Sequence, residues 1–295
     1  MPDPIFDLDY LEYDGARAAP VVRPVIAETP WVLYLDRREW VTFMCTPRDL
    51  HYLALGFLLS EGAIGGLDDV WQIKVYLDED RVYMYFPAAG LDAELALPAC
   101  EEAVGSIDVR LRRPAPARPE RRILTSGCGG GVTFDDLSGA RAPLQSDLRM
   151  SAGQVASLMR QLNEAAGLYR ASRGVHTSAL ADPGPDEGGE RLLVLAEDVG
   201  RHNTLDKIRG ACLMRAIPTR DRVLISSGRI SSEMITKARK MEVPIVVSRT
   251  SPTVLSIGLA KTWNMTLIGY VRGRQMRVYA GAERIIFPEQ DGKPR

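Results

Sequence analysis

Residues 222–248 read RVLISSGRISSEMITKARKMEVPIVVS, an order that predicts a strand, a polar loop, a helix and a second strand. The strand segments, 222–225 and 244–248, are almost entirely apolar, which is typical of strands covered on both faces. Residues 232–241 form the predicted helix, and the serines before it are good helix caps. The stretch therefore predicts one repeat of an α/β sheet.

The same alternation continues on both sides of this stretch. We predict strands at 191–196, 265–270 and 276–279, and helices at 151–168, 204–214 and 252–263. Strands that alternate with helices favour a doubly wound α/β sheet with helices on both faces. We therefore place a C-terminal α/β subdomain at residues 149–295.

The N-terminal part has a different pattern. Apolar segments about short polar turns predict one hairpin at 31–35 and 40–44 and a second at 70–76 and 81–86. Between them, Thr46 and Pro47 suit the cap and the first position of an amphipathic helix. We therefore predict a smaller α+β subdomain at 25–120. An arm at 1–24 precedes it, and a cysteine loop with its connector, 121–148, follows it.

Length, net charge and cysteine spacing limit the classes of protein to which this chain could belong. A chain of 295 residues is long enough for two domains, and its net charge of −1 gives no basis for binding nucleic acid or a membrane. The start of the chain lacks the basic and apolar segments of an export signal, so we expect a cytoplasmic protein with free thiols. None of the four cysteines is at CxxC spacing, and we predict no bound metal.

Residues 125–131 read TSGCGGG and place Cys128 among glycines, which predicts a mobile loop carrying one nucleophile. The alternative is a flexible surface turn with an incidental cysteine. A thiol needs a cationic neighbour to be a thiolate at neutral pH, and Arg201 or Arg229 could supply it in the fold. Cys45 is the rival thiol, because it lies next to a predicted helix start.

Three polar segments follow predicted strands, where open α/β sheets bind their ligands. They are 197–203 with Asp198, Arg201 and His202, 226–232 with Ser227 and Arg229, and 248–251. Hydroxyls, amides and arginines at helix starts indicate an anion site, and phosphate is the commonest guest. The alternative for each loop is simple helix capping. His176 and His202 are equally well interpreted as facing this crevice or as packing residues.

Several motifs together resemble the FdhD/NarQ sulfurtransferases, which are accessory proteins of formate dehydrogenase. The motifs run in family order across the chain: MCTP at 44–47, SGCG at 126–129, GVH at 174–176, EDVGRHNTLDK at 197–207, SSGR at 226–229, SPT at 251–253 and LIGYVR at 267–272.

The resemblance implies a function. Such proteins take sulfur from a cysteine desulfurase as a cysteine persulfide and pass it to the molybdenum or tungsten of a bis-guanine-dinucleotide pterin cofactor, their bound substrate. The persulfide residue maps onto Cys128. The cofactor-binding segment maps onto Tyr270, Val271, Arg272, Gly273, Arg274 and Gln275. The resemblance further implies a cytidine-deaminase-like C-terminal fold, a cytoplasmic homodimer, and the formate dehydrogenase as a partner.

One departure from the family pattern changes the expected chemistry. Many members carry a second cysteine in the loop, where this chain has Gly131. Either Cys128 therefore suffices or Cys45 assists it. Two other functions stay open: a cofactor chaperone without sulfur chemistry, and a cysteine hydrolase with His176 or His202 as its base.

Overall fold

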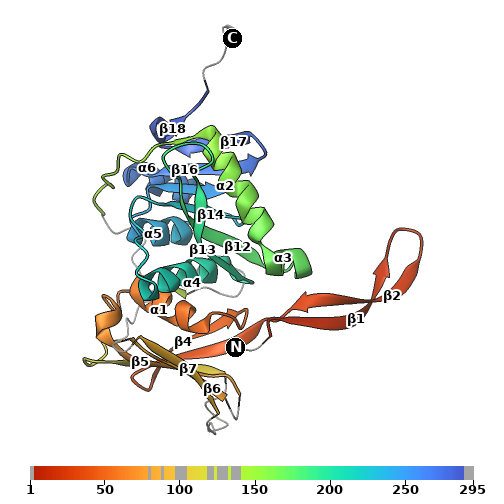
Figure 1. The fold of residues 1–295 in the computed structure, drawn as a ribbon, viewed down its shortest axis with the longest axis vertical. Coiled ribbons are helices and arrows are strands. Elements are labelled where there is room, and N and C mark those ends of the chain that lie inside the picture. The colour runs from red at the N-terminus through yellow and green to blue at the C-terminus, as the bar shows by residue number, and fades with distance from the viewer. Residues whose placement is uncertain are drawn as a thin grey trace. The chain divides into compact units, whose positions relative to one another are not determined.

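The computed structural model describes residues 3–78, 81–87, 90–96, 105–117, 123–124, 132–133 and 141–288. The chain divides into two compact units (Figure 1). The first unit comprises Met1–Asp135, Ala166–His176 and Glu197–Ile217, and the second comprises Asp136–Ala165, Thr177–Ala196 and Pro218–Arg295. The predicted boundaries at 120 and 148 treat the units as successive segments, whereas here the chain passes between the units several times.

The first unit contains a six-stranded sheet with the strand order β4-β3-β8-β5-β6-β7. The strands are β3 (Thr29–Leu35), β4 (Arg38–Cys45), β5 (Val70–Tyr76), β6 (Arg81–Phe86), β7 (Leu91–Ala96) and β8 (Ser106–Leu111). The two predicted hairpins, β3–β4 and β5–β6, are confirmed. The 3-10 helix η1 (Leu67–Asp69) precedes β5, and β9 (Ile123–Leu124) pairs with β10 (Val132–Thr133).

Two helices of the first unit, α1 (Leu50–Ser60) and α4 (Arg201–Met214), pack with their backbones in direct contact. A Cβ atom at Gly56 would lie 1.8 Å from the Asp206 carbonyl oxygen, and one at Gly210 would lie 2.0 Å from the Tyr52 carbonyl oxygen. Glycine at these two positions is what allows the helices to approach so closely.

The predicted cap of α1 is wrong. Asp49, with φ of 55°, precedes the helix and makes no side-chain capping bond. The hydroxyl oxygen of Thr46 instead accepts a hydrogen bond from the amide of Val199, at 3.2 Å. A tertiary partner therefore replaces the local role that the sequence pattern assigned to Thr46.

A long hairpin, β1 (Ile5–Tyr13) and β2 (Ala18–Ile26), extends away from the six-stranded sheet of this unit (Figure 1). It covers most of the predicted arm at 1–24 and extends past its boundary to Ile26. Near its base, β2 contacts the short helix α3 (Gly167–Ser172), where the Ile26 side chain lies against Gly174.

The second unit is built on another six-stranded sheet, with the order β13-β12-β14-β15-β16-β17. The strands are β12 (His176–Asp182), β13 (Arg191–Asp198), β14 (Val223–Ser226), β15 (Ile245–Ser248), β16 (Thr266–Arg272) and β17 (Gln275–Ala280). The strands β14, β15 and β16 are parallel, whereas β12 runs antiparallel to β14 and β17 runs antiparallel to β16. The sheet is therefore mixed.

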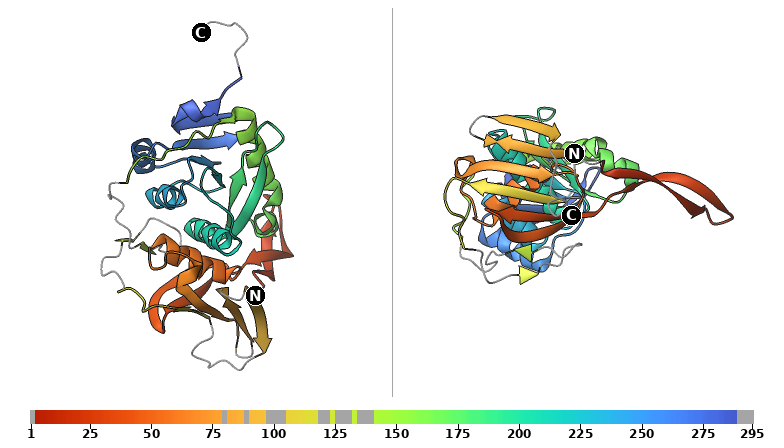
Figure 2. Two further views of the ribbon diagram at one scale, coloured as in Figure 1. Left: turned by 60° about the vertical axis from the view of Figure 1, so that its left-hand side comes forward. Right: turned by 90° about the horizontal axis from the view of Figure 1, so that it is seen from below.

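Helices cover both faces of this sheet, with α2 (Ala152–Ala165) on one side and α5 (Ser232–Lys240) and α6 (Val254–Thr262) on the other (Figure 2). On the α2 side, Val155, Leu158 and Leu162 pack with Val223 and Val247 of the strands. β11 (Met150–Ser151) pairs with β18 (Ile285–Ile286), which follows the 3-10 helix η4 (Ala282–Arg284). The mixed α/β class is confirmed.

Within the described ranges, no helix is both long enough and apolar enough to cross a membrane.

Candidate functional site

The predicted sulfur carrier, Cys128, lies outside the described residues together with the rest of the loop 125–131. Of the predicted junctions, 197–203 belongs to the first unit, and the other two belong to the second.

In the first unit, Asp198 ends β13 and is the buried centre of a cluster of polar residues. Its Oδ2 accepts hydrogen bonds from the Lys207 ammonium at 2.6 Å and from the Thr46 amide at 3.2 Å. Its Oδ1 accepts from the Gly200 amide at 2.7 Å and from Asn203 Nδ2 at 2.9 Å. A carboxylate with four donors is held firmly in one orientation.

The same cluster fastens residues 44–46 to the start of α4. Lys207 donates to the Thr46 carbonyl at 3.1 Å, and Asn203 donates to the Met44 carbonyl at 3.1 Å. Because Asp198 and Lys207 are 0% and 1% exposed, they do not face a substrate in solution. Asp198 therefore acts as a positioning residue in this unit.

Cys45 lies inside this cluster and is fully buried. Burial, and next the negative charge of Asp198, raise the pKa of its thiol far above the ordinary range, and the Lys207 ammonium offsets this only in part. Burial likewise raises the pKa of Cys212, to about 12. Both thiols are therefore protonated at neutral pH, the opposite of what an activated nucleophile requires.

The other predicted residues of this junction are also largely enclosed. Arg201 and His202, in the first turn of α4, are 3% and 6% exposed, and His176 is half-buried at the start of β12. Glu197 accepts the amides of Leu168 and Tyr169 at 2.8 and 2.9 Å, which anchors the start of α3. The structure thus gathers Asp198, Arg201 and His202 around the start of α4.

In the second unit, loops from three neighbouring strands are joined by hydrogen bonds at the carboxyl edge of the sheet. The Ser248 hydroxyl donates to the Gly228 carbonyl at 2.6 Å and accepts from the Thr250 amide at 3.0 Å. The Thr250 carbonyl in turn accepts from the Tyr270 amide at 3.1 Å. The predicted segments 226–232, 248–251 and 270–275 therefore meet.

Several hydroxyl groups of these loops already make hydrogen bonds to other parts of the second unit. Ser227 Oγ accepts the Thr177 amide at 2.9 Å, and Ser231 caps α5 through the Met234 amide. Thr253 and Ser256 form a capping box at the start of α6. The capping interpretation is therefore right for Ser231 but wrong for segment 248–251, because α6 is capped by Thr253 rather than Ser251.

The arginines of these loops differ from the serines, because Arg229 and Arg249 are exposed. At the turn from β16 to β17, Arg272, Gly273, Arg274 and Gln275 are exposed as well, whereas Val271 is buried. Exposed guanidinium groups on loops fixed by a sheet edge suit recognition of phosphate groups.

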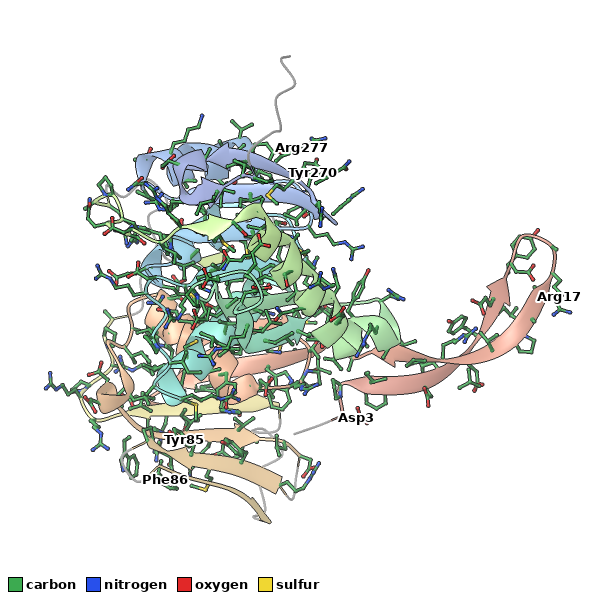
Figure 3. All side chains as sticks on the ribbon, turned by 45° about the horizontal axis from the view of Figure 1, so that its top comes forward. Asp3, Arg17, Tyr85, Phe86, Tyr270 and Arg277 are labelled. Atoms are coloured by element: carbon green, nitrogen blue, oxygen red, sulfur yellow. The ribbon has the colours of Figure 1, made fainter. Side chains whose placement is uncertain are left out.

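Tyr270 has φ of 54°, a left-handed conformation that is uncommon for a residue other than glycine. Its ring lies against Arg277, whose Cζ is 4.2 Å from the ring centroid (Figure 3). A Cβ atom at the preceding residue, Gly269, would lie 2.8 Å from the Thr250 carbonyl oxygen. The backbone thus approaches the Thr250 loop closely. The sequence placed Thr250 in the polar segment 248–251, whereas Arg277 was not identified because it belongs to no recognised local motif.

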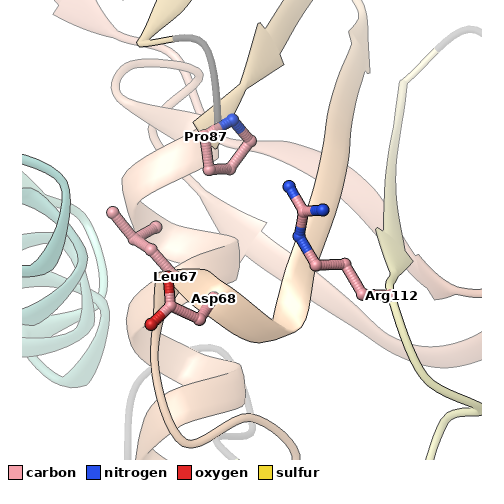
Figure 4. Close-up of a pocket in the computed structure, with 4 residues that line it drawn as sticks. All are labelled: Leu67, Asp68, Pro87 and Arg112. Atoms are coloured by element: carbon pink, nitrogen blue, oxygen red, sulfur yellow. The ribbon is translucent and has the colours of Figure 1, made fainter.

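A separate recess lies in the first unit and is lined by Leu67, Asp68, Pro87 and Arg112 (Figure 4). None of the predicted site residues lines it. Among the described side chains, no three histidines, cysteines or carboxylates gather as they would around a metal ion.

Comparison with known proteins gives a consistent result. The model of the FdhD/NarQ family matches residues 26–286. The sulfur carrier protein FdhD of Bacillus subtilis is 33% identical over 280 residues, which cover 94% of this chain and 96% of that one. Its counterpart from Halalkalibacterium halodurans is 34% identical over 275 residues, 90% of each chain.

A solved structure is also similar. The crystal structure described as that of a formate dehydrogenase accessory protein from Desulfotalea psychrophila has a TM-score of 0.71 and 25% identity. The match covers 96% of this chain and all of that one.

Proposed function

Because this chain belongs to the FdhD/NarQ family, we propose that it is a sulfur carrier for a formate dehydrogenase, with Cys128 as the carrying residue. The Cys128 thiolate attacks the terminal sulfur of a desulfurase persulfide. The sulfur–sulfur bond of the donor breaks, the desulfurase thiolate leaves, and Cys128 becomes a persulfide. The glycines on either side of Cys128 suit a sulfur that must reach both a donor and an acceptor.

The second step delivers this sulfur to the molybdenum or tungsten of a bis-guanine-dinucleotide pterin, which is the substrate. The Cys128 thiolate is released, and the metal supplies the two electrons that convert sulfane sulfur to sulfide. In this proposal the phosphates of the substrate bind the exposed arginines of the second unit, Arg229, Arg272 and Arg274. Their place on loops joined at one sheet edge is the observation that carries the proposal.

The buried residues have a supporting role in this proposal. Asp198 holds the start of α4, Arg201 and His202 are enclosed beside it, and the buried thiol of Cys45 does not assist the transfer. The proposal also includes a homodimer in the cytoplasm. For the second unit it includes a cytidine-deaminase-like fold, and a sheet with helices on both faces is compatible with that fold.

Mass spectrometry after incubation with a cysteine desulfurase and cysteine tests the proposal. Wild-type protein and Cys45→Ala should gain the mass of one sulfur atom, removable by a thiol reductant, whereas Cys128→Ala should not. A gain that persists in Cys128→Ala would refute the role of Cys128. If Cys128→Ala instead activates formate dehydrogenase fully, the chain delivers the cofactor without sulfur chemistry.

A further inference from the structure

The hairpin β1–β2 exposes much of its apolar surface. Its two strands form a sheet of their own, with no third strand among the described residues. Phe6, Leu8, Leu11 and Tyr13 are 54%, 50%, 72% and 69% exposed. Figure 3 shows side chains standing out from both strands between Asp3 at the base and Arg17 near the tip. Exposed apolar surface of this kind marks interaction sites, and a two-stranded hairpin has little stability without a partner.

The hydrogen-bond pattern shows which backbone groups of β1 face outward. The Ala27 amide donates to the Pro4 carbonyl at 2.8 Å, and the register then pairs Ile5 with Ile26. Because hydrogen-bonded and non-bonded pairs alternate in an antiparallel ladder, the even-numbered residues of β1 bond to β2. The odd-numbered residues from Ile5 to Tyr13 direct their amides and carbonyls away from β2. The first of these amides, that of Ile5, is capped by Asp3 Oδ1 at 3.0 Å.

The opposite edge of the hairpin is blocked. Pro20 and Pro24 of β2 pair with Leu11 and Asp7, which are non-bonded positions, so the outer edge of β2 lacks two of its amide donors. Proline on an edge strand prevents the addition of a further strand. The outer edge of β1 is therefore the one that is open to pairing.

The side chains of β1 specify the chemistry of an added strand. Phe6, Leu8 and Tyr10 lie on one face of the hairpin, and Asp7 and Asp9 lie on the other. Both aspartates are exposed, and neither has a basic partner within the described ranges. Beside residues 6–10, an added strand would meet apolar neighbours and carboxylates in alternation, which favours a segment in which apolar residues alternate with lysine or arginine.

A second copy of β1 does not meet this requirement. Two β1 edges paired about a two-fold axis would bring Asp7 and Asp9 of both copies to the shared surface, and like charges on neighbouring strands destabilise a sheet.

We propose that the outer edge of β1 is a docking site that adds an extended basic and apolar segment of another protein as a third strand. The inference does not depend on the sulfur transfer proposed above. The outer edge of β1 binds the partner segment through main-chain hydrogen bonds, and Asp7 and Asp9 give the specificity.

Fluorescence polarisation with a synthetic peptide tests the proposal on the full-length chain. The labelled probe has the length of β1 and alternates valine with lysine. Wild-type protein should bind it, and a probe with glutamate in place of lysine should not bind. N-methylation of alternate amides on one edge of the lysine probe should also abolish binding. Equal binding of all three probes would overturn the proposal.

Two proline variants form a matched pair. Asp9→Pro removes an outward amide of β1 and leaves the ladder intact, and should weaken binding at least about tenfold. Val22, which pairs with Asp9 across the hairpin, gives the control. Val22→Pro removes an amide on the already blocked edge of β2, so this variant should bind the probe like wild type. Asp9→Asn should weaken probe binding about threefold to tenfold, and added salt should reduce the affinity of this variant less than that of wild type.

Hydrogen exchange supplies a readout that does not depend on affinity. The probe should slow exchange within residues 5–13 of the wild-type chain but leave Asp9→Pro unchanged. Exchange in the six-stranded sheet of the first unit should match among the variants, which shows that they fold. Concentration-dependent dimerisation that Asp9→Pro abolishes, with no probe binding to wild type, would assign this edge to a second copy and overturn the proposal.

Discussion

The Lys207 ammonium lies 2.6 Å from the Asp198 carboxylate, and neither side chain is reached by solvent. Removing one member of such a pair leaves a buried charge without its counter-charge. We expect Lys207→Met to lower the free energy of unfolding by about 3–5 kcal/mol, measured by urea denaturation.

The exposed pair Arg81–Asp78, also separated by 2.6 Å, is the control for this measurement. Because water screens that pair, Arg81→Met should cost no more than about 1 kcal/mol. Similar costs for the two variants would contradict the role assigned to Asp198.

The helix contact of the first unit gives a second prediction. Gly210→Ala places a Cβ atom 2.0 Å from the Tyr52 carbonyl oxygen, so α1 and α4 must move apart. The variant should lose about 1–3 kcal/mol or more of stability, seen as a lower melting temperature.

Gly258→Ala is the matched control, because Gly258 lies inside α6 and an added Cβ meets no atom within 4 Å. Alanine is a better helix former, so this variant should gain up to about 1 kcal/mol. Equal melting temperatures for Gly210→Ala and Gly258→Ala would exclude the close contact.

Most strands and helices were predictable, because their apolar residues follow the period of each element. The role of Thr46 was not, since its hydroxyl bonds to Val199, 153 positions away, and no local rule detects such a partner. The hairpin within the predicted arm was missed, although Phe6, Leu8 and Tyr10 alternate with polar residues as a strand would.

The residues of the candidate site were likewise predictable only in part from the sequence. Ser227 and Arg229 were predicted because strand ends in an α/β sheet bind ligands, whereas Tyr270 was predicted only from the family resemblance. Whether a residue at such a junction is buried depends on packing, which explains why Arg201 and His202 are enclosed while Arg229 is exposed.

Alkaline pH should destabilise the protein through its buried thiols. Burial raises the pKa of Cys212 from 9.0 to about 12. Above about pH 9 the unfolded chain releases this proton while the folded chain keeps it, so stability falls by up to about 1.4 kcal/mol per pH unit. The contribution is fully present below pH 9 and is lost as the pH rises toward 12.

The variant Cys212→Ala isolates this effect, because it removes one titrating thiol and leaves the others. Its stability should fall less steeply than that of wild type between about pH 9 and 10.5, measured by urea unfolding at each pH. Parallel curves for the two proteins would show that Cys212 titrates in the folded state at its ordinary pKa.

Under the proposed function, the arginines of the β16–β17 turn should contribute most of the free energy of binding guanine nucleotides. Arg272 and Arg274 are exposed beside Gly273, whose φ of 56° shapes the turn. Charge-assisted hydrogen bonds to phosphate are worth about 1.5–3 kcal/mol, so Arg274→Ala should weaken GDP binding about tenfold to hundredfold in calorimetry. Arg17→Ala, in the exposed turn of the β1–β2 hairpin, is the control and should bind like wild type. Undiminished GDP affinity in both Arg272→Ala and Arg274→Ala would place the nucleotide elsewhere.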